Sequence, residues 1–205
     1  MTVGTEIRPN LLPSRDDLQG ARLRLFEAAI VQFGARGYHA VSVRDLMSEL
    51  GQQPGALYFH VASKEHLLFE LVKIGLDVHR DRLKAALLDA GREPHAQVRA
   101  VVEEHVCAHL DYPALARVTI REITSLTGEN LATALAMRTE NARILLDVIK
   151  RGVEIQAFGT TEPDLAVHAI GAMGMRAVEW WTPDSPHSKD HVARTYGDFA
   201  LKVLV

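Results

Sequence analysis

The sequence has a single cysteine and no long hydrophobic run, and each absence excludes a class of protein. Cys107 has no second cysteine for an intramolecular disulfide, which fits a reducing compartment. No N-terminal apolar stretch resembles a signal peptide, and no segment reaches the roughly 18 uninterrupted apolar residues that a membrane span needs. We therefore expect a cytoplasmic protein without a membrane partner.

The chain also lacks an excess of basic charge. Its net charge is -3 and its pI is near 6.4, which argues against a protein that coats nucleic acid through bulk charge. A sequence-specific binder needs only a local patch, so specific DNA binding stays open.

Motifs of catalysis are missing as well. The sequence contains no phosphate-binding glycine loop, no nucleophile elbow and no metalloprotease helix motif. We therefore predict no enzyme, no catalytic residue and no cofactor.

What the sequence does contain is a pair of short helical patterns between Val41 and Lys64. Ser42 can cap the first, because its hydroxyl can accept a free backbone N–H. The apolar stripe that follows has three- and four-residue spacing and consists of Val43, Leu46, Met47 and Leu50. Gly51 ends it, Pro54 can open a second helix, and Leu57 and Val61 keep that helix on the same core. This pattern is typical of a helix-turn-helix, whose second helix enters the DNA major groove.

The rest of the chain also predicts helices, and no alternating strand pattern appears. Ser14 or Asp16 can cap a first long helix that ends near Gly34 and Gly37. After the helix-turn-helix, apolar spacing and Pro or Gly breakers predict helices over 63–90, 96–110, 113–126, 129–158, 163–181 and 188–204. The fold class is therefore all-α with about nine helices.

Residues 22–68 resemble the DNA-binding domain of the TetR family of bacterial transcriptional regulators. The matching residues are Ala28, Phe33, Gly37-Tyr38, Ser42-Val43, Asp45-Leu46, Gly51, Gly55-Ala56-Leu57-Tyr58-Phe59-His60, Ser63-Lys64-Glu65 and Leu67-Leu68. Gln53-Pro54 stands where the family commonly has a serine or threonine cap. Residues 1–14 carry Gly4, Pro9, Asn10 and Pro13 with little periodicity, and we expect them to form a flexible arm. The resemblance implies a DNA-binding domain over 15–62 and a ligand-binding and dimerisation domain over 63–205 that opens with a connecting helix over 63–90.

The resemblance also implies which residues meet DNA. Gln52 and Gln53 open the recognition helix at Pro54, and glutamine can pair with adenine. The small Gly55 and Ala56 allow close approach to the bases. The remaining expected contacts are to the phosphate backbone and come from Ser42, Arg44, Tyr58, His60 and Lys64.

A single helix-turn-helix reads few base pairs, so we expect a homodimer on a palindromic double-stranded operator. The last two long helices are the candidates for its interface, because small residues there allow close helix approach and aromatic residues suit an interface core. The expected dimer residues are Ile170, Gly171, Gly174, Val178, Trp181, Tyr196 and Phe199.

A small-molecule effector is the third expected partner. Polar residues lie on apolar stripes of the C-terminal half, and a charged group there needs a partner such as an anionic head group. We expect His105, His109, Arg138, Arg176 and Trp180 to bind such a ligand, of the lipid or acyl-CoA kind that related regulators bind. The arginines can instead pair on the surface with Glu140, Asp147 or Glu179.

Two alternatives stay open. The pairs His105–His109 and His187–His191 have a spacing that can bind zinc, but no third ligand is identifiable, so no metal site is predicted. The chain can also be a helical ligand-binding or adaptor protein whose helix-turn-helix has lost DNA binding. A test of nonspecific DNA or heparin binding at low salt separates these functions.

Overall fold

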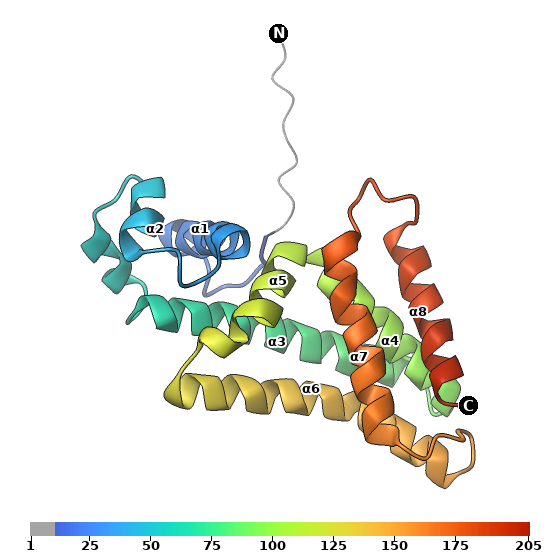
Figure 1. Ribbon diagram of the computed structural model, residues 1–205. Coiled ribbons are helices and arrows are strands. Elements are labelled where there is room, and N and C mark those ends of the chain that lie inside the picture. The colour runs from blue at the N-terminus through green and yellow to red at the C-terminus, as the bar shows by residue number, and fades with distance from the viewer. Residues whose placement is uncertain (1–10) are drawn as a thin grey trace.

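Helices make up almost the whole of the computed structural model, which describes residues 11–205. Over these residues there are eight α-helices and two 3-10 helices: α1 (Gly20–Arg36), α2 (Val43–Glu49), η1 (Pro54–Phe59), α3 (Lys64–Asp89), α4 (Pro94–Asp111), α5 (Pro113–Glu122), η2 (Ile123–Ser125), α6 (Gly128–Glu154), α7 (Pro163–Trp180) and α8 (Lys189–Val203). With η2 taken as the last turn of α5, the all-α prediction of about nine helices is confirmed (Figure 1).

The helix ends mostly follow the caps that the sequence offers. Ser42 forms a capping box with Asp45: its Oγ accepts the Asp45 N–H at 3.1 Å, and the Asp45 carboxylate accepts the Ser42 N–H at 2.8 Å. Ser63 caps α3 by accepting the His66 N–H at 2.9 Å.

Two expected ends were wrong. The first helix is not capped by Ser14 or Asp16 but starts at Gly20, because the preceding residues form a separate turn that buries Leu18 in the core. The predicted helix over 129–158 stops at Glu154. Gln156 there takes a left-handed conformation, with φ 61°.

One hydrophobic core joins the N-terminal helices to the C-terminal half. Its side chains come from α1, α2, η1 and the first half of α3, and also from α5 and η2. Leu11 and Leu12 pack against this core, so residues 11–14 are not the free arm that the sequence suggested. The rest of that arm, residues 1–10, lies outside the described residues.

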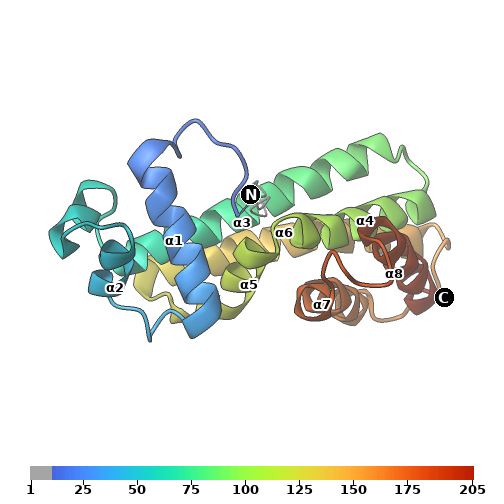
Figure 2. The ribbon, with the colours of Figure 1, turned by 90° about the horizontal axis from the view of Figure 1, so that it is seen from above.

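The C-terminal half is elongated. Helices α3 and α6 run side by side along its length, with α2 and η1 at one end and α7 and α8 towards the other (Figures 1 and 2). Helix α4 packs against α3, α7 and α8. None of the helices within 11–205 is both long and apolar enough to cross a membrane.

Candidate functional site

The N-terminal end of η1, which we call its leading edge, is exposed to solvent. Gln52, Gln53, Pro54 and Gly55 are exposed, whereas Leu57 is fully buried and fixes the helix to the core. A Cβ at Gly55 would meet no atom within 4 Å. The side of η1 that the sequence assigned to base pairs is therefore open to solvent.

The recognition helix itself is a 3-10 helix of six residues rather than an α-helix. Gln53 stands at its N-cap and makes no side-chain cap hydrogen bond, as expected where a serine or threonine is missing. A 3-10 helix has three residues per turn and is used in short pieces.

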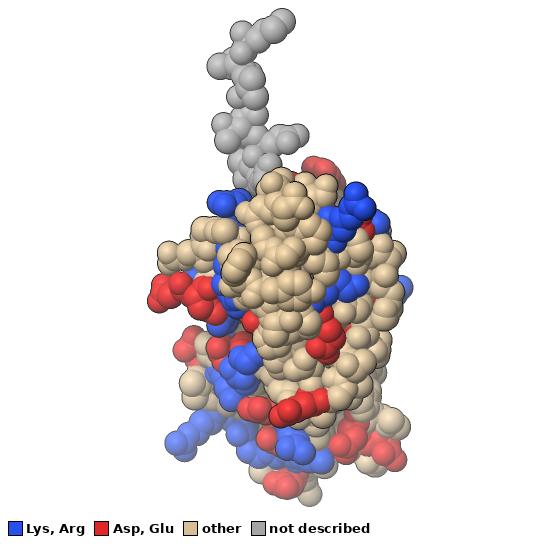
Figure 3. All heavy atoms as spheres, turned by 90° about the vertical axis from the view of Figure 1, so that its left-hand side faces the viewer, with Lys and Arg blue, Asp and Glu red and all other residues tan. Residues whose placement is uncertain are grey.

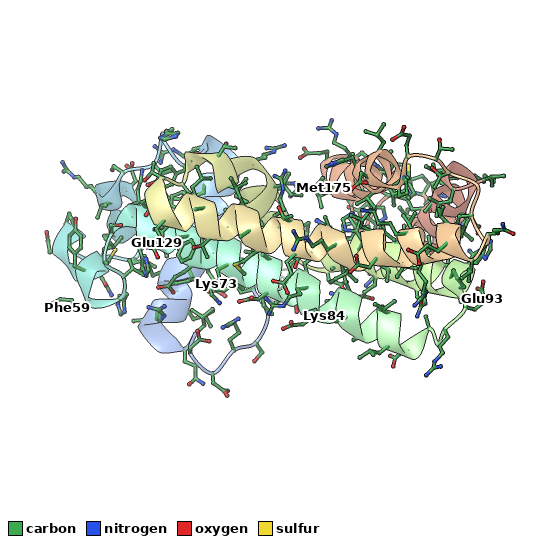
Figure 4. All side chains as sticks on the ribbon, turned by 90° about the horizontal axis from the view of Figure 1, so that it is seen from below. Phe59, Lys73, Lys84, Glu93, Glu129 and Met175 are labelled. Carbon is green, nitrogen blue, oxygen red and sulfur yellow. The ribbon has the colours of Figure 1, made fainter. Side chains whose placement is uncertain are left out.

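Sequence reasoning gave no role to Phe59, which is 88% exposed at the tip of the molecule (Figure 4). Its neighbour Tyr58 is 62% exposed, in keeping with the expected contact to DNA. The sequence could have predicted this exposure. Leu57 and Val61 lie four residues apart on the core face, so Phe59, midway between them, must point away from the core.

The far end of η1 is held in place by Arg22 of α1, another residue that sequence reasoning missed. Its guanidinium donates to the backbone carbonyl of His60 and pairs with Glu70 of α3. His66 lies 3.1 Å from the same carboxylate. This bridge fixes the angle between η1, α1 and α3, on which the presentation of the leading edge depends.

Lys64 does not fit its expected role as a phosphate contact. Its Nζ donates to the carbonyls of Tyr38 at 3.0 Å and Val41 at 2.7 Å, and it lies 4.0 Å from the centre of the Tyr38 ring. Partial burial lowers the pKa of Lys64. Its ammonium ties the start of α3 to the loop before α2.

We therefore expect Lys64→Met to lower the free energy of unfolding by about 2 kcal/mol, since two carbonyls lose a charged donor. The salt dependence of DNA binding should not change. Urea denaturation and binding titrations at several salt concentrations measure both. Lys73→Met is the matched control on the same helix, because its exposed pair with Asp77 contributes little. A salt slope that falls by about one would restore Lys64 as a phosphate contact.

Ser42 and Arg44 are exposed at the start of α2, beside η1. The Ser42 hydroxyl lies 2.8 Å from the Asp45 carboxylate, which also pairs with Arg36 at 3.6 Å. Figure 3 looks onto this end of the molecule, where basic and acidic side chains are interspersed around a largely uncharged surface. This mixture of charges agrees with the lack of a basic excess in the sequence, so affinity for DNA must come from individually placed groups.

A cavity of about 610 Å³ lies between helices α3 to α7. Most of its lining is apolar, and the apolar residues include Leu76, Val101, Leu115, Ile120, Leu145 and Ile170. His105, His109 and Arg138 line it, as the sequence predicted for a ligand site. The surface ion pairs offered as an alternative do not involve Arg138 among the described residues, because Glu140 pairs with Lys84 and Glu179 with Arg121.

Two expected ligand residues, Arg176 and Trp180, do not line this cavity. Both are exposed on the outer side of α7, and the Trp180 side chain is 47% exposed. Their spacing does place them on one face, but that face points away from the protomer's own core.

Several of the expected dimer residues point towards the interior of their own protomer. Ile170 and Val178 are buried in their own protomer's cores, and Gly174 lies under the His105 ring, where a Cβ would overlap it. The Gly171 carbonyl faces His105 at 3.1 Å. Ile170, Gly174 and Val178 therefore face the interior of their own protomer, whereas Gly171 is partly exposed and has open space at its Cβ position.

The three remaining expected dimer residues differ in their exposure. Trp181 donates from Nε1 to the His187 carbonyl at 2.9 Å and packs on its own core, and Tyr196 is partly buried as well. Phe199 of α8 is 43% exposed. The apolar residues that α7 and α8 show to solvent are therefore a different set, namely Leu165, Ala169, Ala172, Trp180, Phe199 and Val203, which we call the outer face.

A helix-turn-helix with a bare leading edge, joined through one core to a helical unit with a cavity, defines a DNA-binding regulatory protein. Models of known protein families match both the N-terminal and the C-terminal part of the chain and support this class. Residues 25–71 match the model of bacterial regulatory proteins of the tetR family, and residues 91–204 match the tetracyclin repressor-like C-terminal domain. The chain belongs to the TetR family, and it is a DNA-binding transcriptional regulator rather than an enzyme.

Relatives match over most of the chain. The HTH-type transcriptional repressor KstR2 of Rhodococcus jostii is 27% identical over 94% of this chain and 96% of its own. The structure of PfmR from Thermus thermophilus is 31% identical with a TM-score of 0.78, covering 87% of this chain and 97% of that one. AibR, solved in complex with isovaleryl coenzyme A and operator DNA, is 19% identical with a TM-score of 0.78, covers 86% and 96%, and shows the fold alone.

Proposed function

We propose that the chain is a homodimeric repressor that leaves its operator when a mainly apolar, anionic small molecule fills the cavity. The observation that carries this proposal is that α5 lines the cavity with one side and packs against the helix-turn-helix core with the other. The relative KstR2 is named a repressor, which supports the direction of control.

The ligand class follows from the chemistry of the cavity. Its apolar lining suits an acyl chain or a ring system, while Arg138, Arg143 and Lys150 are exposed residues of α6 along its edge. Lys150 is already paired with Asp164 at 3.6 Å. An apolar body with an acidic head group, as in an acyl-coenzyme A thioester, matches this arrangement, and the AibR complex shows that a protein of this fold accommodates one.

The coupling to DNA runs through α3 and α5. Leu115, Thr119 and Ile123 line the cavity, and Val118 on the same helix is buried beside Gly34 of α1. A ligand that displaces α5 or the second half of α3 therefore moves the helix-turn-helix. The division into a DNA-binding part over 15–62 and a ligand-binding part over 63–205 is one of function, because the two share a core.

The outer face of α7 and α8 is the dimer surface in this proposal. It presents small and aromatic side chains at helical spacing, with Arg176 among them, and a twofold contact would cover the exposed Trp180. Arg176, Trp180 and Phe199 are then dimer residues. Two recognition helices held by this contact can meet successive turns of one duplex.

The test of the function uses a duplex selected by the protein from a random-sequence library. Operator affinity should fall when an acyl-coenzyme A series is added, and by reciprocity the same duplex should weaken binding of the active acyl-coenzyme A by the same factor. Equal thioester affinity with and without the duplex would contradict the mechanism. Failure to select any duplex or to bind heparin at low salt would favour the adaptor alternative.

The edge of the cavity gives a further prediction. We expect Arg138→Glu combined with Arg143→Glu to weaken binding of the active acyl-coenzyme A at least about tenfold, because an acidic head group would meet like charge. Operator affinity without ligand should change less than twofold. Isothermal titration measures the first and fluorescence anisotropy the second. Arg92→Glu combined with Arg194→Glu, two exposed reversals outside the cavity that add the same charge, is the control, and an equal loss there would show that only net charge matters.

A further inference from the structure

Three histidines from two helices meet in the wall of the cavity. His79 comes from α3, and His105 and His109 come from successive turns of α4. One ring nitrogen of each lies within 4.8 Å of those of the other two, and His79 Nε2 is 2.8 Å from His105 Nδ1. Sequence spacing could show the α4 pair but not the third member, which lies 26 residues earlier in the chain.

The second nitrogens of the α4 pair are held by backbone carbonyls. Because a carbonyl only accepts, His105 donates from Nε2 to Gly171 O at 3.1 Å, and His109 donates from Nδ1 to His105 O at 2.6 Å. The lone pairs are thereby left on His105 Nδ1 and His109 Nε2. Histidine ligands of metals are usually oriented by such bonds to the nitrogen that does not bind the ion.

The surroundings keep the rings in place and neutral. Gly174 leaves the space that the His105 ring occupies, and Asn141 lies 3.3 Å from His79 Nδ1 while donating to Leu76 O. Burial lowers the pKa of all three rings, that of His105 to about 3 with help from His109. Neutral imidazole is the form that binds metals.

From this geometry we propose that His79, His105 and His109 bind one divalent transition-metal ion of the zinc, cobalt or nickel class inside the cavity. Three imidazoles leave a fourth position of a tetrahedral ion open, and since all three side chains line the cavity, that position faces the space a ligand occupies.

Modest movements complete the site. Two nitrogens bound to one tetrahedral ion at about 2.0–2.1 Å lie roughly 3.3 Å apart. The His79–His105 pair must therefore open by about half an ångström, and His109, which lies within 4.8 Å of both, must move towards them by at most about 1.5 Å. His79 binds the ion through Nε2 once its proton has moved to Nδ1, and because the Asn141 amide nitrogen lies beside Nδ1, the Asn141 amide must then turn its oxygen towards that proton and give up its bond to Leu76 O.

The experiment titrates the full-length protein, stripped with a chelator, with Zn²⁺ and Co²⁺. We expect one ion per protomer by calorimetry, and visible absorption from Co²⁺ of the intensity that four-coordination gives. Long-range proton–nitrogen correlation spectra of the unmodified protein should show three imidazoles shifting on Zn²⁺ addition. This last measurement needs no variant and does not depend on any variant folding.

His79→Gln and His105→Gln should each weaken binding of Zn²⁺ at least a hundredfold. The matched control is His187→Gln with His191→Gln, because those rings also lie close together, 5.1 Å between centres, but on the exposed surface. Stoichiometry below half an ion per protomer would overturn the site, as would loss of binding in the control or spectra in which fewer than three rings shift.

Discussion

Gly55→Glu is expected to weaken binding to the selected duplex at least about a hundredfold, the largest single loss on the DNA-binding surface. The side chain would stand at the exposed start of η1, where the helix must approach base edges, and its carboxylate would lie among phosphates. The fold should not be affected, because a Cβ at this position meets nothing within 4 Å. Fluorescence anisotropy gives the affinity, and the melting temperature confirms the fold.

Ala85→Glu is the matched control for this result. Ala85 is exposed on the second half of α3, remote in sequence from η1, and the change adds the same charge to the chain. Binding within about threefold of the unmodified protein in Gly55→Glu would show that η1 does not enter the groove. The helix-turn-helix would then serve another purpose, as the adaptor alternative requires.

Ala172→Glu on α7 is expected to convert the dimer to monomers and to cost about two to four orders of magnitude in operator affinity. A twofold contact repeats every residue, so two carboxylates would face one another in a desolvated interface. Ala172 is exposed within one protomer, so the monomer should keep its melting profile. Sedimentation velocity measures the oligomeric state, and the same duplex measures the affinity.

The control distinguishes an effect of the position on α7 from an effect of the added negative charge. Ala85→Glu should remain dimeric, and a DNA loss caused by monomerisation should be partly recovered as protein concentration rises. A dimeric Ala172→Glu variant would place the interface elsewhere than on the outer face. A monomeric variant with unchanged operator affinity would contradict the need for two recognition helices.

Local features were predictable because their causes are local. The Ser42 cap, the stop at Gly51 and the small residue at Gly55 each depend on chemistry within one or two turns. The family resemblance covered the same stretch. Residues such as Arg22 and Lys64 were missed or misassigned because their partners lie 38 to 48 and 23 to 26 positions away in the chain.

Helix α7 shows the limit of periodicity most clearly. It is apolar on two sides: Ile170 and Val178 on one, Leu165 and Ala172 on the other. A helical pattern reports which residues share a face but not which face meets the core when both are apolar. The sequence-based choice of dimer residues therefore took the inward side, and the ligand residues Arg176 and Trp180 were assigned to the cavity when they belong outside it.

The sequence by itself determined that the chain is all-helical, that it carries a helix-turn-helix, and that its recognition helix begins with small uncharged residues, since spacing and caps act over a few residues. Only the tertiary structure decided which side of α7 is free, how α5 links the cavity to α1, and that His79 joins the two histidines of α4. Those outcomes depend on how whole helices cross, and side chains far apart in the chain meet only once the helices are packed.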